Sequence, residues 1–180
     1  MEKKAPLLFF APFVSSTMQV EPAWIDHNGH MNMAYYHVMF DRAVEEGFGL
    51  IGLGRDYVEE RKASLFAAET HTLYKRELKV RNEVRVTLQL FDYDEKRIHY
   101  YLEIRHAAEG WVAATMEGLS LHVDLETRKV SPFPEDIFAN LAVMKAAHGR
   151  LQRPQALGRI IGVPARLEKH EALLALGTRH

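Results

Sequence analysis

The stretch AWIDHNGHMNMAYYHVMFDRAVEEGF, residues 23–48, decides the fold. Its second half has apolar residues at helical spacing, which predicts a helix from Met33 to about Leu50 with one buried stripe. Asn32 stands just before this helix, where its side chain can cap a free backbone N–H. Glycines at positions 47, 49, 52 and 54 then end the helix. Residues 26–32 place a carboxylate, two imidazoles and two amides at the expected helix N-terminus.

The segments on either side of this helix predict β-structure. Residues 14–25, VSSTMQVEPAWI, suit a first strand that ends near Pro22. From Ser64 onward the period changes to two, and four runs predict consecutive antiparallel strands: SLFAAETHTLYKREL, EVRVTLQLFDYD, RIHYYLEIRHA and GWVAATMEGLSLHVDL. A short helix is expected from Pro134, and ARLEKHEALLALG suits another in the tail. This order predicts an α+β hot-dog fold, an antiparallel sheet wrapped around one long helix.

Length and composition limit the class of protein. The 180 residues suit one domain, which we place at 1–148, followed by a C-terminal extension at 149–180. A net charge of −1 gives no support for nucleic-acid or membrane binding. The chain has no cysteine, which excludes disulfides, thiolate metal sites and a Cys nucleophile. With no convincing signal peptide and no run of about 20 apolar residues, a cytoplasmic location is expected.

Three local matches connect the chain to a known family. Asp26-x-Asn28-Gly29-His30-x-Asn32 resembles the D-x-x-G-H-x-N motif of hot-dog thioesterases of the 4-hydroxybenzoyl-CoA thioesterase type. YKREL, residues 74–78, resembles the end of that family's second strand, although Arg81-Asn82-Glu83 stands where many relatives carry Gly-Asp. DEKRIHYYLEIRH and ATMEGLSLHVDLETRKVSPFP resemble a bacterial branch that includes betainyl-CoA thioesterases of carnitine catabolism. The resemblance implies an acyl-CoA thioesterase that needs no cofactor, with coenzyme A as part of its substrate.

The residues themselves suit thioester hydrolysis. This reaction needs a nucleophile or a base that activates water, together with donors for the developing oxyanion. Asp26 can act as the base or the nucleophile, and the helix N-terminus offers the backbone amides of Asn32 and Met33 as oxyanion donors. Asn28 can orient water or the carbonyl group, and His30 can steady the loop or share a proton. Ordinary turn and capping roles would suit the same residue types.

Two carboxylates in the strand runs are further candidates. Glu69 and Glu117 lie within apolar stretches, where an unpaired carboxylate is costly to bury. Either could orient Asn28 or His30, or activate water. The alternative is that each faces solvent on a half-exposed sheet.

Three other catalytic arrangements are disfavoured. Ser120, His122 and Asp124 alternate on one strand, so their side chains project in parallel about 7 Å apart and do not form a relay. The sequence contains no Gly-x-Ser-x-Gly, which excludes the α/β-hydrolase elbow. His27, His30 and His37 have no acidic partner at a recognised metal spacing, so catalysis without a metal is expected.

Substrate contacts can also be assigned. Arg76, Lys79 and Arg81 could bind the phosphates of coenzyme A, although solubilisation of an edge strand would explain the same charges. The aromatic candidates for the acyl pocket are Trp24, Tyr35, Tyr36 and Trp111, which could attract a quaternary ammonium group or belong to the core.

The family resemblance implies a homodimer or a dimer of dimers in which sheet edges pair and the sites lie between subunits. Two alternatives to the thioesterase interpretation stay open. One is a hot-dog hydratase or dehydratase of acyl thioesters, and the other is a non-catalytic acyl-CoA-binding module.

Overall fold

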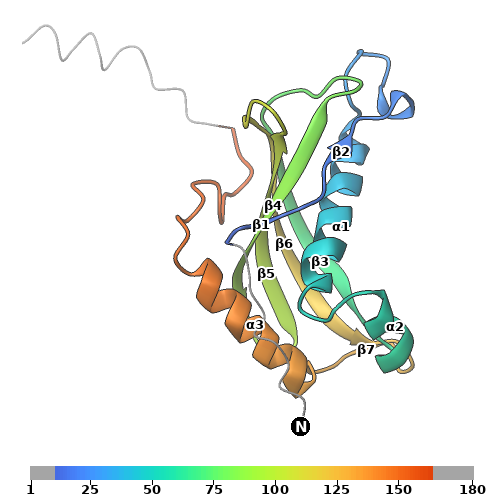
Figure 1. Cartoon of the computed structure of the whole chain (residues 1–180), viewed down its shortest axis with the longest axis vertical. Helices are drawn as coiled ribbons and strands as arrows, with labels where there is room; N and C mark the ends of the chain where they lie inside the picture. The colour runs from blue at the N-terminus through green and yellow to red at the C-terminus, as the bar shows by residue number, and fades with distance from the viewer. Residues whose placement is uncertain (1–10, 164–180) are drawn as a thin grey trace, which may run out of the picture.

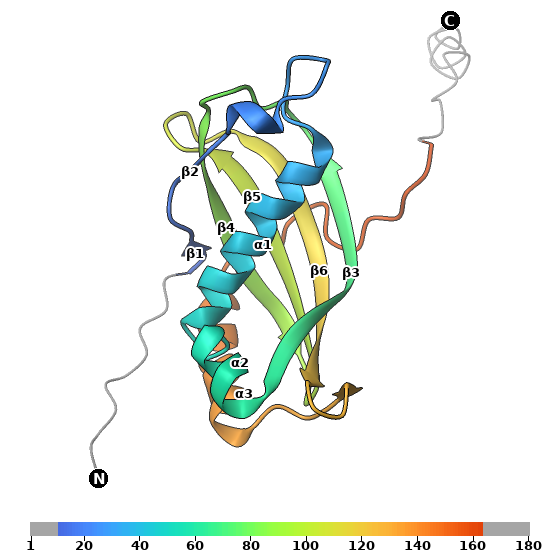
Figure 2. The same cartoon turned by 90° about the vertical axis from the view of Figure 1, so that its right-hand side faces the viewer.

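The structure, a computed structural model, describes residues 11–163, so the helix expected at 165–177 lies outside the described residues. One long helix, α1 (Met33–Gly49), lies along one face of an antiparallel sheet (Figures 1 and 2). This arrangement confirms the predicted α+β hot-dog class. Within residues 11–163, no helix combines the length and the apolar character required to cross a bilayer.

Helix α1 begins and packs as its sequence predicts. The side chain of Asn32 accepts a hydrogen bond from the N–H of Ala34 at 3.0 Å, which confirms the N-cap. The buried stripe of α1 comprises Tyr36, Met39, Phe40, Ala43, Gly47 and Phe48. It packs on the alternate residues of the central strands that face it, among them Leu88, Leu102 and Ile104, all of which are fully buried. The expected helical face therefore forms the core.

The sheet contains the four predicted strands, β3 (Ala63–Tyr74), β4 (Glu83–Tyr93), β5 (Arg97–His106) and β6 (Val112–Asp124). Their order is β4-β5-β6-β3, so β3 pairs with β6 and not with β4, its successor in sequence. The segment between β3 and β4 crosses the end of the sheet beside the N-terminus of α1, where the N–H of Met31 donates to the carbonyl of Leu78. Strand β3 ends at Tyr74, four residues before the expected Leu78, because the chain must leave the sheet for this crossing.

The other elements cover the margins of the sheet. The expected first strand is two short ones, β1 (Phe13–Val14) and β2 (Met18–Gln19), both paired with β4. They are followed by a 3₁₀ turn, η1 (Pro22–Trp24). A short helix that the sequence did not predict, α2 (Arg55–Arg61), precedes β3, and β7 (Lys129–Val130) pairs with β6. The predicted helix after Pro134 is α3 (Glu135–His148), which contacts β4.

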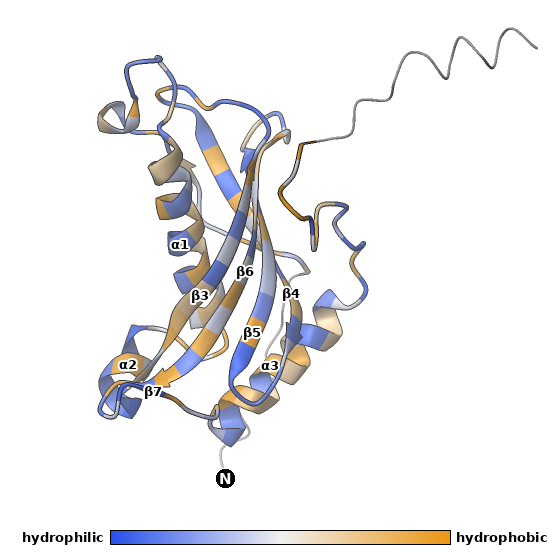
Figure 3. Ribbon diagram, turned by 180° about the vertical axis from the view of Figure 1, so that it is seen from behind, coloured by the Kyte–Doolittle hydropathy of each residue, from blue (hydrophilic) through white to orange (hydrophobic). Residues whose placement is uncertain are grey.

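The face of the sheet away from α1 is mixed in character. Hydrophilic and hydrophobic residues follow one another along its strands (Figure 3). Residues 149–163 continue from α3, and the N–H of Gly158 donates to Glu117 of β6 at 2.6 Å. The division of the chain between residues 148 and 149 stays a prediction.

Candidate active site at the N-terminus of helix α1

A tight loop carries Asp26 to the mouth of α1. The N–H of Asp26 donates to the carbonyl of His30 at 3.1 Å, and the N–H of Gly29 donates to the carbonyl of Asp26 at 3.0 Å. Gly29 has a φ of +80°, in the left-handed region that glycine adopts without strain. The requirement for glycine at this position is therefore conformational, since an added Cβ would meet no atom within 4 Å.

The carboxylate of Asp26 is held by one of its two oxygens. Oδ1 accepts a hydrogen bond from the N–H of Asn28 at 2.8 Å, as in an Asx turn. Within the described part of the chain, no hydrogen bond is made to Oδ2. The side chain is 15% exposed, so this oxygen is close to solvent without being fully hydrated. Such a carboxylate is suited to hold a water molecule or to approach an electrophile.

His30 and Asn28 lie beside Asp26 in different ways. Nδ1 of His30 is 3.9 Å from Oδ1 of Asp26, which is too long for a hydrogen bond. Its contact with Asp26 is electrostatic, and a proton relay is not formed in this geometry. Asn28 is exposed, and its observed bond to Asp26 comes from its backbone.

The two backbone amides expected to bind an oxyanion differ. The N–H of Asn32 donates to the carbonyl of Trp24 at 2.9 Å and is occupied. Met33, the first residue of α1, has no acceptor for its N–H among residues 11–163. The N–H of Met33 is therefore the free donor at the positive end of the helix.

Asp26 opens into a pocket of about 460 Å³ at this end of the molecule. The pocket is formed by the loop that carries Asp26 and His30, the first turn of α1 and the chain at the end of β3. Its lining residues are Asp26, His30, Met31, Asn32, Met33, Tyr36, Tyr74, Lys75, Arg76 and Glu77. Four of the residues selected as catalytic or oxyanion candidates, Asp26, His30, Asn32 and Met33, thus share one pocket.

Two tyrosines line this pocket, Tyr36 from α1 and Tyr74 from the end of β3. The rings of Tyr36 and Tyr74 meet edge to face, with their centroids 5.1 Å apart. The hydroxyl of Tyr36 accepts a hydrogen bond from the N–H of Leu78 at 3.2 Å, which ties the crossing segment to α1. Burial raises the pKa of both phenols, so both remain neutral near pH 7. Sequence reasoning missed Tyr74, although its alternation with Thr72 in the β3 run placed it on the helix-facing side.

The other aromatic candidates do not line this pocket. Trp24 and Tyr35 stack on each other with ring centroids 5.2 Å apart, and Arg42 lies over Trp24. Trp111 stacks on His106, with the guanidinium of Arg76 4.1 Å from its ring centroid. Of the four aromatic residues predicted for the acyl group, Tyr36 alone lies in the Asp26 pocket.

The three basic candidates are also separated. Arg76 lines the pocket together with Lys75, which was not among the predicted residues. Lys79 and Arg81 are exposed on the crossing segment and do not line this pocket. Arg81 has a φ of +67°, in the left-handed region that favours glycine. The turn is completed by Asn82, whose side chain accepts from the N–H of Lys79.

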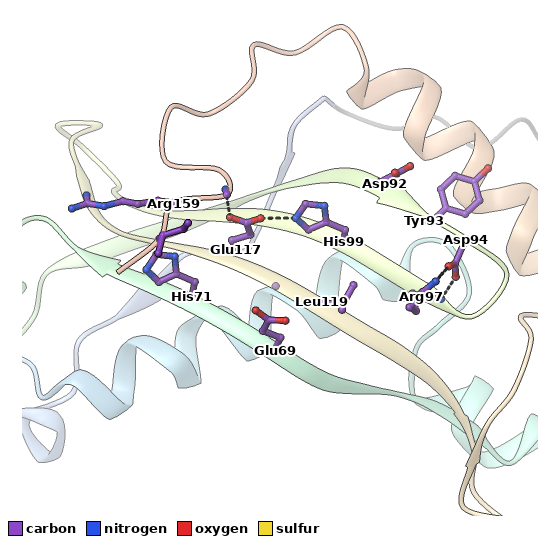
Figure 4. Close-up of a pocket in the computed structure, with 13 residues that line it drawn as sticks. Glu69, His71, Asp92, Tyr93, Asp94, Arg97, His99, Glu117, Leu119 and Arg159 are labelled. Carbon is purple, nitrogen blue, oxygen red and sulfur yellow. Dashed lines mark hydrogen bonds and ion pairs between the residues drawn. The ribbon is translucent and has the colours of Figure 1, made fainter. Parts of the chain in front are cut away.

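Glu69 and Glu117 lie on the face of the sheet away from α1 (Figure 4). They line a different pocket, where His71 pairs in register with Glu117. Oε1 of Glu117 is 2.8 Å from Nε2 of His99. Within one chain, the structure therefore does not bring either glutamate to Asp26. The bonds of Glu117 to His99 and Gly158 explain how its 19%-exposed side chain is accommodated.

The disfavoured arrangements are not assembled. Ser120 bonds to the hydroxyl of Tyr100, and Nε2 of His122 to the hydroxyl of Tyr57. The carboxylate of Asp124 accepts from Thr127. The three residues thus have separate partners, and the rejection of a triad is confirmed. In residues 11–163 no three His, Cys, Asp or Glu side chains gather in a way that could hold a metal ion.

Comparison with known proteins identifies the family of this chain. The Thioesterase-like superfamily profile matches residues 20–141. A Pseudomonas aeruginosa protein named betainyl-CoA thioesterase is 33% identical over 145 residues, which cover 81% of this chain and 91% of that protein. A Rhizobium meliloti protein named L-carnitine dehydrogenase/betainyl-CoA thioesterase is 38% identical over 144 residues, 80% of this chain but 29% of the longer protein.

A solved structure agrees with the sequence matches. A Staphylococcus aureus protein, determined in complex with CoA, superposes with a TM-score of 0.78 and 30% identity, covering 87% of this chain and 99% of that one. The matched family residues extend from the Asp26 loop through all four long strands to α3. The chain therefore belongs to the Thioesterase-like superfamily of hot-dog proteins.

Proposed function

We propose that this protein is an acyl-CoA thioesterase that uses Asp26 to hydrolyse a small acyl-CoA thioester. The observation that carries the proposal is the pairing of a carboxylate and a free helix N-terminal N–H in one pocket, supplied by Asp26 and Met33. Hydrolysis needs a base or nucleophile and an oxyanion donor, and these two groups supply them.

The reaction can follow either of two routes. As a general base, Asp26 takes a proton from a water molecule through Oδ2 while the water oxygen attacks the thioester carbonyl carbon. As a nucleophile, Oδ2 of Asp26 itself attacks that carbon and forms an acyl-aspartyl anhydride, which water then hydrolyses. In both routes the oxyanion accepts a hydrogen bond from the N–H of Met33, and the C–S bond breaks as the carbonyl re-forms. In the general-base route Asp26 returns the proton that it took from water to the departing sulfur, whereas in the nucleophilic route CoA leaves as the thiolate and takes its proton from solvent.

The substrate class follows from the relatives. The Pseudomonas protein named betainyl-CoA thioesterase matches over most of both chains, so we propose betainyl-CoA as the substrate, in carnitine catabolism. Arg76 with Lys75 at the mouth, and Lys79 and Arg81 outside it, would attract the phosphates of coenzyme A. No cofactor is needed for this chemistry, and the location proposed is cytoplasmic.

The assembly proposed is a homodimer or a dimer of dimers. Strand β3 is 12 residues long and pairs with β6 alone in the described sheet, so one of its edges is open. Pairing of this edge with that of a second copy would extend the sheet and place the two Asp26 pockets beside the dimer interface. Sedimentation velocity at micromolar concentration is expected to give a dimer or a tetramer, and a monomer would contradict the proposal.

The experiment that tests the activity uses purified full-length protein, a panel of acyl-CoAs and a thiol reagent. Release of free CoA is expected, most rapidly from betainyl-CoA. Loss of the α,β-unsaturated absorbance of an enoyl-CoA, with no free thiol, would instead support the hydratase alternative. Saturable binding of acyl-CoA with neither reaction would support the binding module.

A further inference from the structure

Trp111 supports Arg76, one of the two basic residues that line the Asp26 pocket. The guanidinium carbon of Arg76 lies over the indole, 4.1 Å from the ring centroid, which is within the range of a cation–π contact. The imidazole of His106 stacks on the same indole, with ring centroids 4.9 Å apart and an interplanar angle of 20°. The indole ring therefore contacts a guanidinium from the end of β3 and an imidazole from the end of β5.

The backbone anchors both partners of this contact at the start of β6. The N–H groups of Lys75 and Arg76 donate to the carbonyl of Ala113, at 2.8 and 3.0 Å. The N–H of His106 donates to the carbonyl of Trp111 at 2.9 Å and closes the turn between β5 and β6. Because the backbones of Trp111 and Arg76 are fixed, the contact with the ring is what restrains the far end of the arginine side chain.

The guanidinium of Arg76 is available to a ligand. The two carboxylates of the pocket are engaged elsewhere, since Asp26 accepts from the N–H of Asn28 and Glu77 lies 3.7 Å from Nζ of Lys79. Within residues 11–163, the guanidinium makes neither an ion pair nor a hydrogen bond. An arginine that stacks on an aromatic face keeps the N–H donors at its edge free, and that edge matches two oxygens of a phosphate.

The residue type at position 111 is informative. Nε1 of Trp111 is buried and has no hydrogen-bond acceptor among the described residues. A buried donor without an acceptor is destabilising, so phenylalanine or leucine would suit a purely structural position better. Tryptophan, however, gives the strongest cation–π attraction of the aromatic side chains. The unpaired N–H is explained if the face of the ring, and not its donor, is what the site uses.

The contact also determines where the guanidinium lies. Trp111 does not line the Asp26 pocket, so the group that rests on it lies at the margin of the pocket, toward the turn between β5 and β6. In an acyl-CoA the phosphates follow the thioester at the far end of the pantetheine arm. A thioester at Asp26 would therefore have its phosphates outside the pocket, and an arginine at the margin is placed to meet them.

From this arrangement we propose that Trp111 is a positioning residue, which holds Arg76 at the margin of the pocket for a phosphate group of the CoA part of the substrate. The inference rests on the proposed thioesterase function and identifies a residue that supports binding of its substrate. Because Trp111 acts through Arg76, its loss weakens binding and leaves the chemical step unchanged.

The test compares betainyl-CoA with betainyl-pantetheine, which has the same thioester and lacks the phosphates. Trp111→Leu and Arg76→Gln are each expected to raise KM for the CoA ester about three- to tenfold, with kcat unchanged and with no change in KM for the pantetheine ester. Trp111→Phe keeps a ring face and should remain closer to wild type than Trp111→Leu. An equal rise for both esters, or no rise for either, would overturn the proposal while leaving the thioesterase function intact.

A double-mutant cycle tests whether Trp111 acts through Arg76. In the Arg76→Gln background, Trp111→Leu is expected to raise KM by less than about twofold further, and effects that multiply would overturn the proposal. Arg42→Gln is the matched control, since Arg42 lies over Trp24, 5.5 Å from its ring centroid, and does not line the Asp26 pocket. This control should keep the wild-type KM. Trp111→Met takes the place of Trp111→Leu in the cycle if circular dichroism shows that the leucine variant does not fold.

A binding measurement separates this inference from the catalytic one. Calorimetry with CoA and with pantetheine gives the contribution of the phosphates directly, without hydrolysis. Wild type is expected to bind CoA more tightly than pantetheine, and Trp111→Leu to lose most of that difference. Equal affinity of wild type and Trp111→Leu for CoA overturns the proposal. A protein that shows the expected binding but releases no CoA from any thioester would contradict the proposed function alone.

Discussion

The backbone N–H of Asn28 lies 2.8 Å from Oδ1 of Asp26 and orients the carboxylate that we place at the centre of the chemistry. Because the donor is a backbone group, it does not depend on the Asn28 side chain. Asn28→Ala is therefore expected to retain the orientation of Asp26, with kcat lowered less than tenfold. A loss of 100-fold or more would show that the amide side chain itself acts on water or substrate, as the sequence first suggested.

Replacement of Met33 by proline tests the oxyanion donor. Proline is accepted at the first helical position, and Asn32 already has the extended φ of −61° and ψ of 143° that a residue before proline prefers. The substitution removes the N–H with little other change, and kcat is expected to fall about 10²–10³-fold. Met33→Leu, which keeps the amide, should have nearly wild-type activity. Full activity in the proline variant would assign the oxyanion to another donor.

The effect of a substitution at Gly29 is expected to depend on how readily the new residue adopts a positive φ, and not on the size of its side chain. Gly29→Val should lower the free energy of unfolding by about 1–2 kcal/mol and reduce kcat, because a β-branched residue is strained at φ +80°. Gly29→Asn, which adopts this region more readily, should be milder in both respects. Denaturant unfolding and steady-state kinetics give the two quantities, and equal effects of the two variants would contradict the explanation.

The helix and strands were predictable because each has a regular local pattern. Asn32 as cap, the apolar stripe of α1 and the alternation in the four runs are all properties of neighbouring residues. The pairing of β3 with β6 was not predictable in this way, since it depends on the path of the segment that contains Leu78. Helix α2 was missed because its seven residues carry one buried side chain, Tyr57, and no amphipathic repeat.

In the candidate site, too, the residues that are neighbours in sequence were predictable and the contacts between distant elements were not. Asp26, His30, Asn32 and Met33 are adjacent in sequence, and the structure keeps them in one pocket. Contacts across the fold were harder to predict. Glu69 and Glu117 looked buried from their strand sequences, but the pleat directs them to the face away from α1. Tyr74 was missed because it reaches the pocket from β3, by its ring contact with Tyr36 of α1, and the sequence did not give the relative placement of these two elements.

The N-cap makes a separate prediction about stability. Asn32→Ala removes the acceptor for the Ala34 N–H and is expected to cost about 1 kcal/mol, measured as a lower midpoint of thermal unfolding. Asn32→Asp retains a capping oxygen and should remain close to wild type. Equal destabilisation by both substitutions would indicate that another property of the Asn32 side chain matters.

Buried tyrosines predict a loss of stability at alkaline pH. Burial raises the pKa of Tyr100, so the folded state keeps its proton after the unfolded chain has lost it. Its contribution is complete below the ordinary tyrosine pKa of about 10 and is lost as pH rises through the folded-state pKa. The unfolding temperature of Tyr100→Phe should consequently fall less between pH 9 and pH 11 than that of wild type. An identical fall would contradict the assignment to this residue.

The most direct test of the account is the release of free CoA from betainyl-CoA by wild type and by Asp26→Asn, with circular dichroism and sedimentation confirming that both are folded and equally assembled. We expect wild type to turn over and the variant to lose at least about 100-fold in kcat, the magnitude typical of removing a general base or nucleophile. A folded Asp26→Asn protein that hydrolyses the thioester at close to the wild-type rate would contradict the central claim.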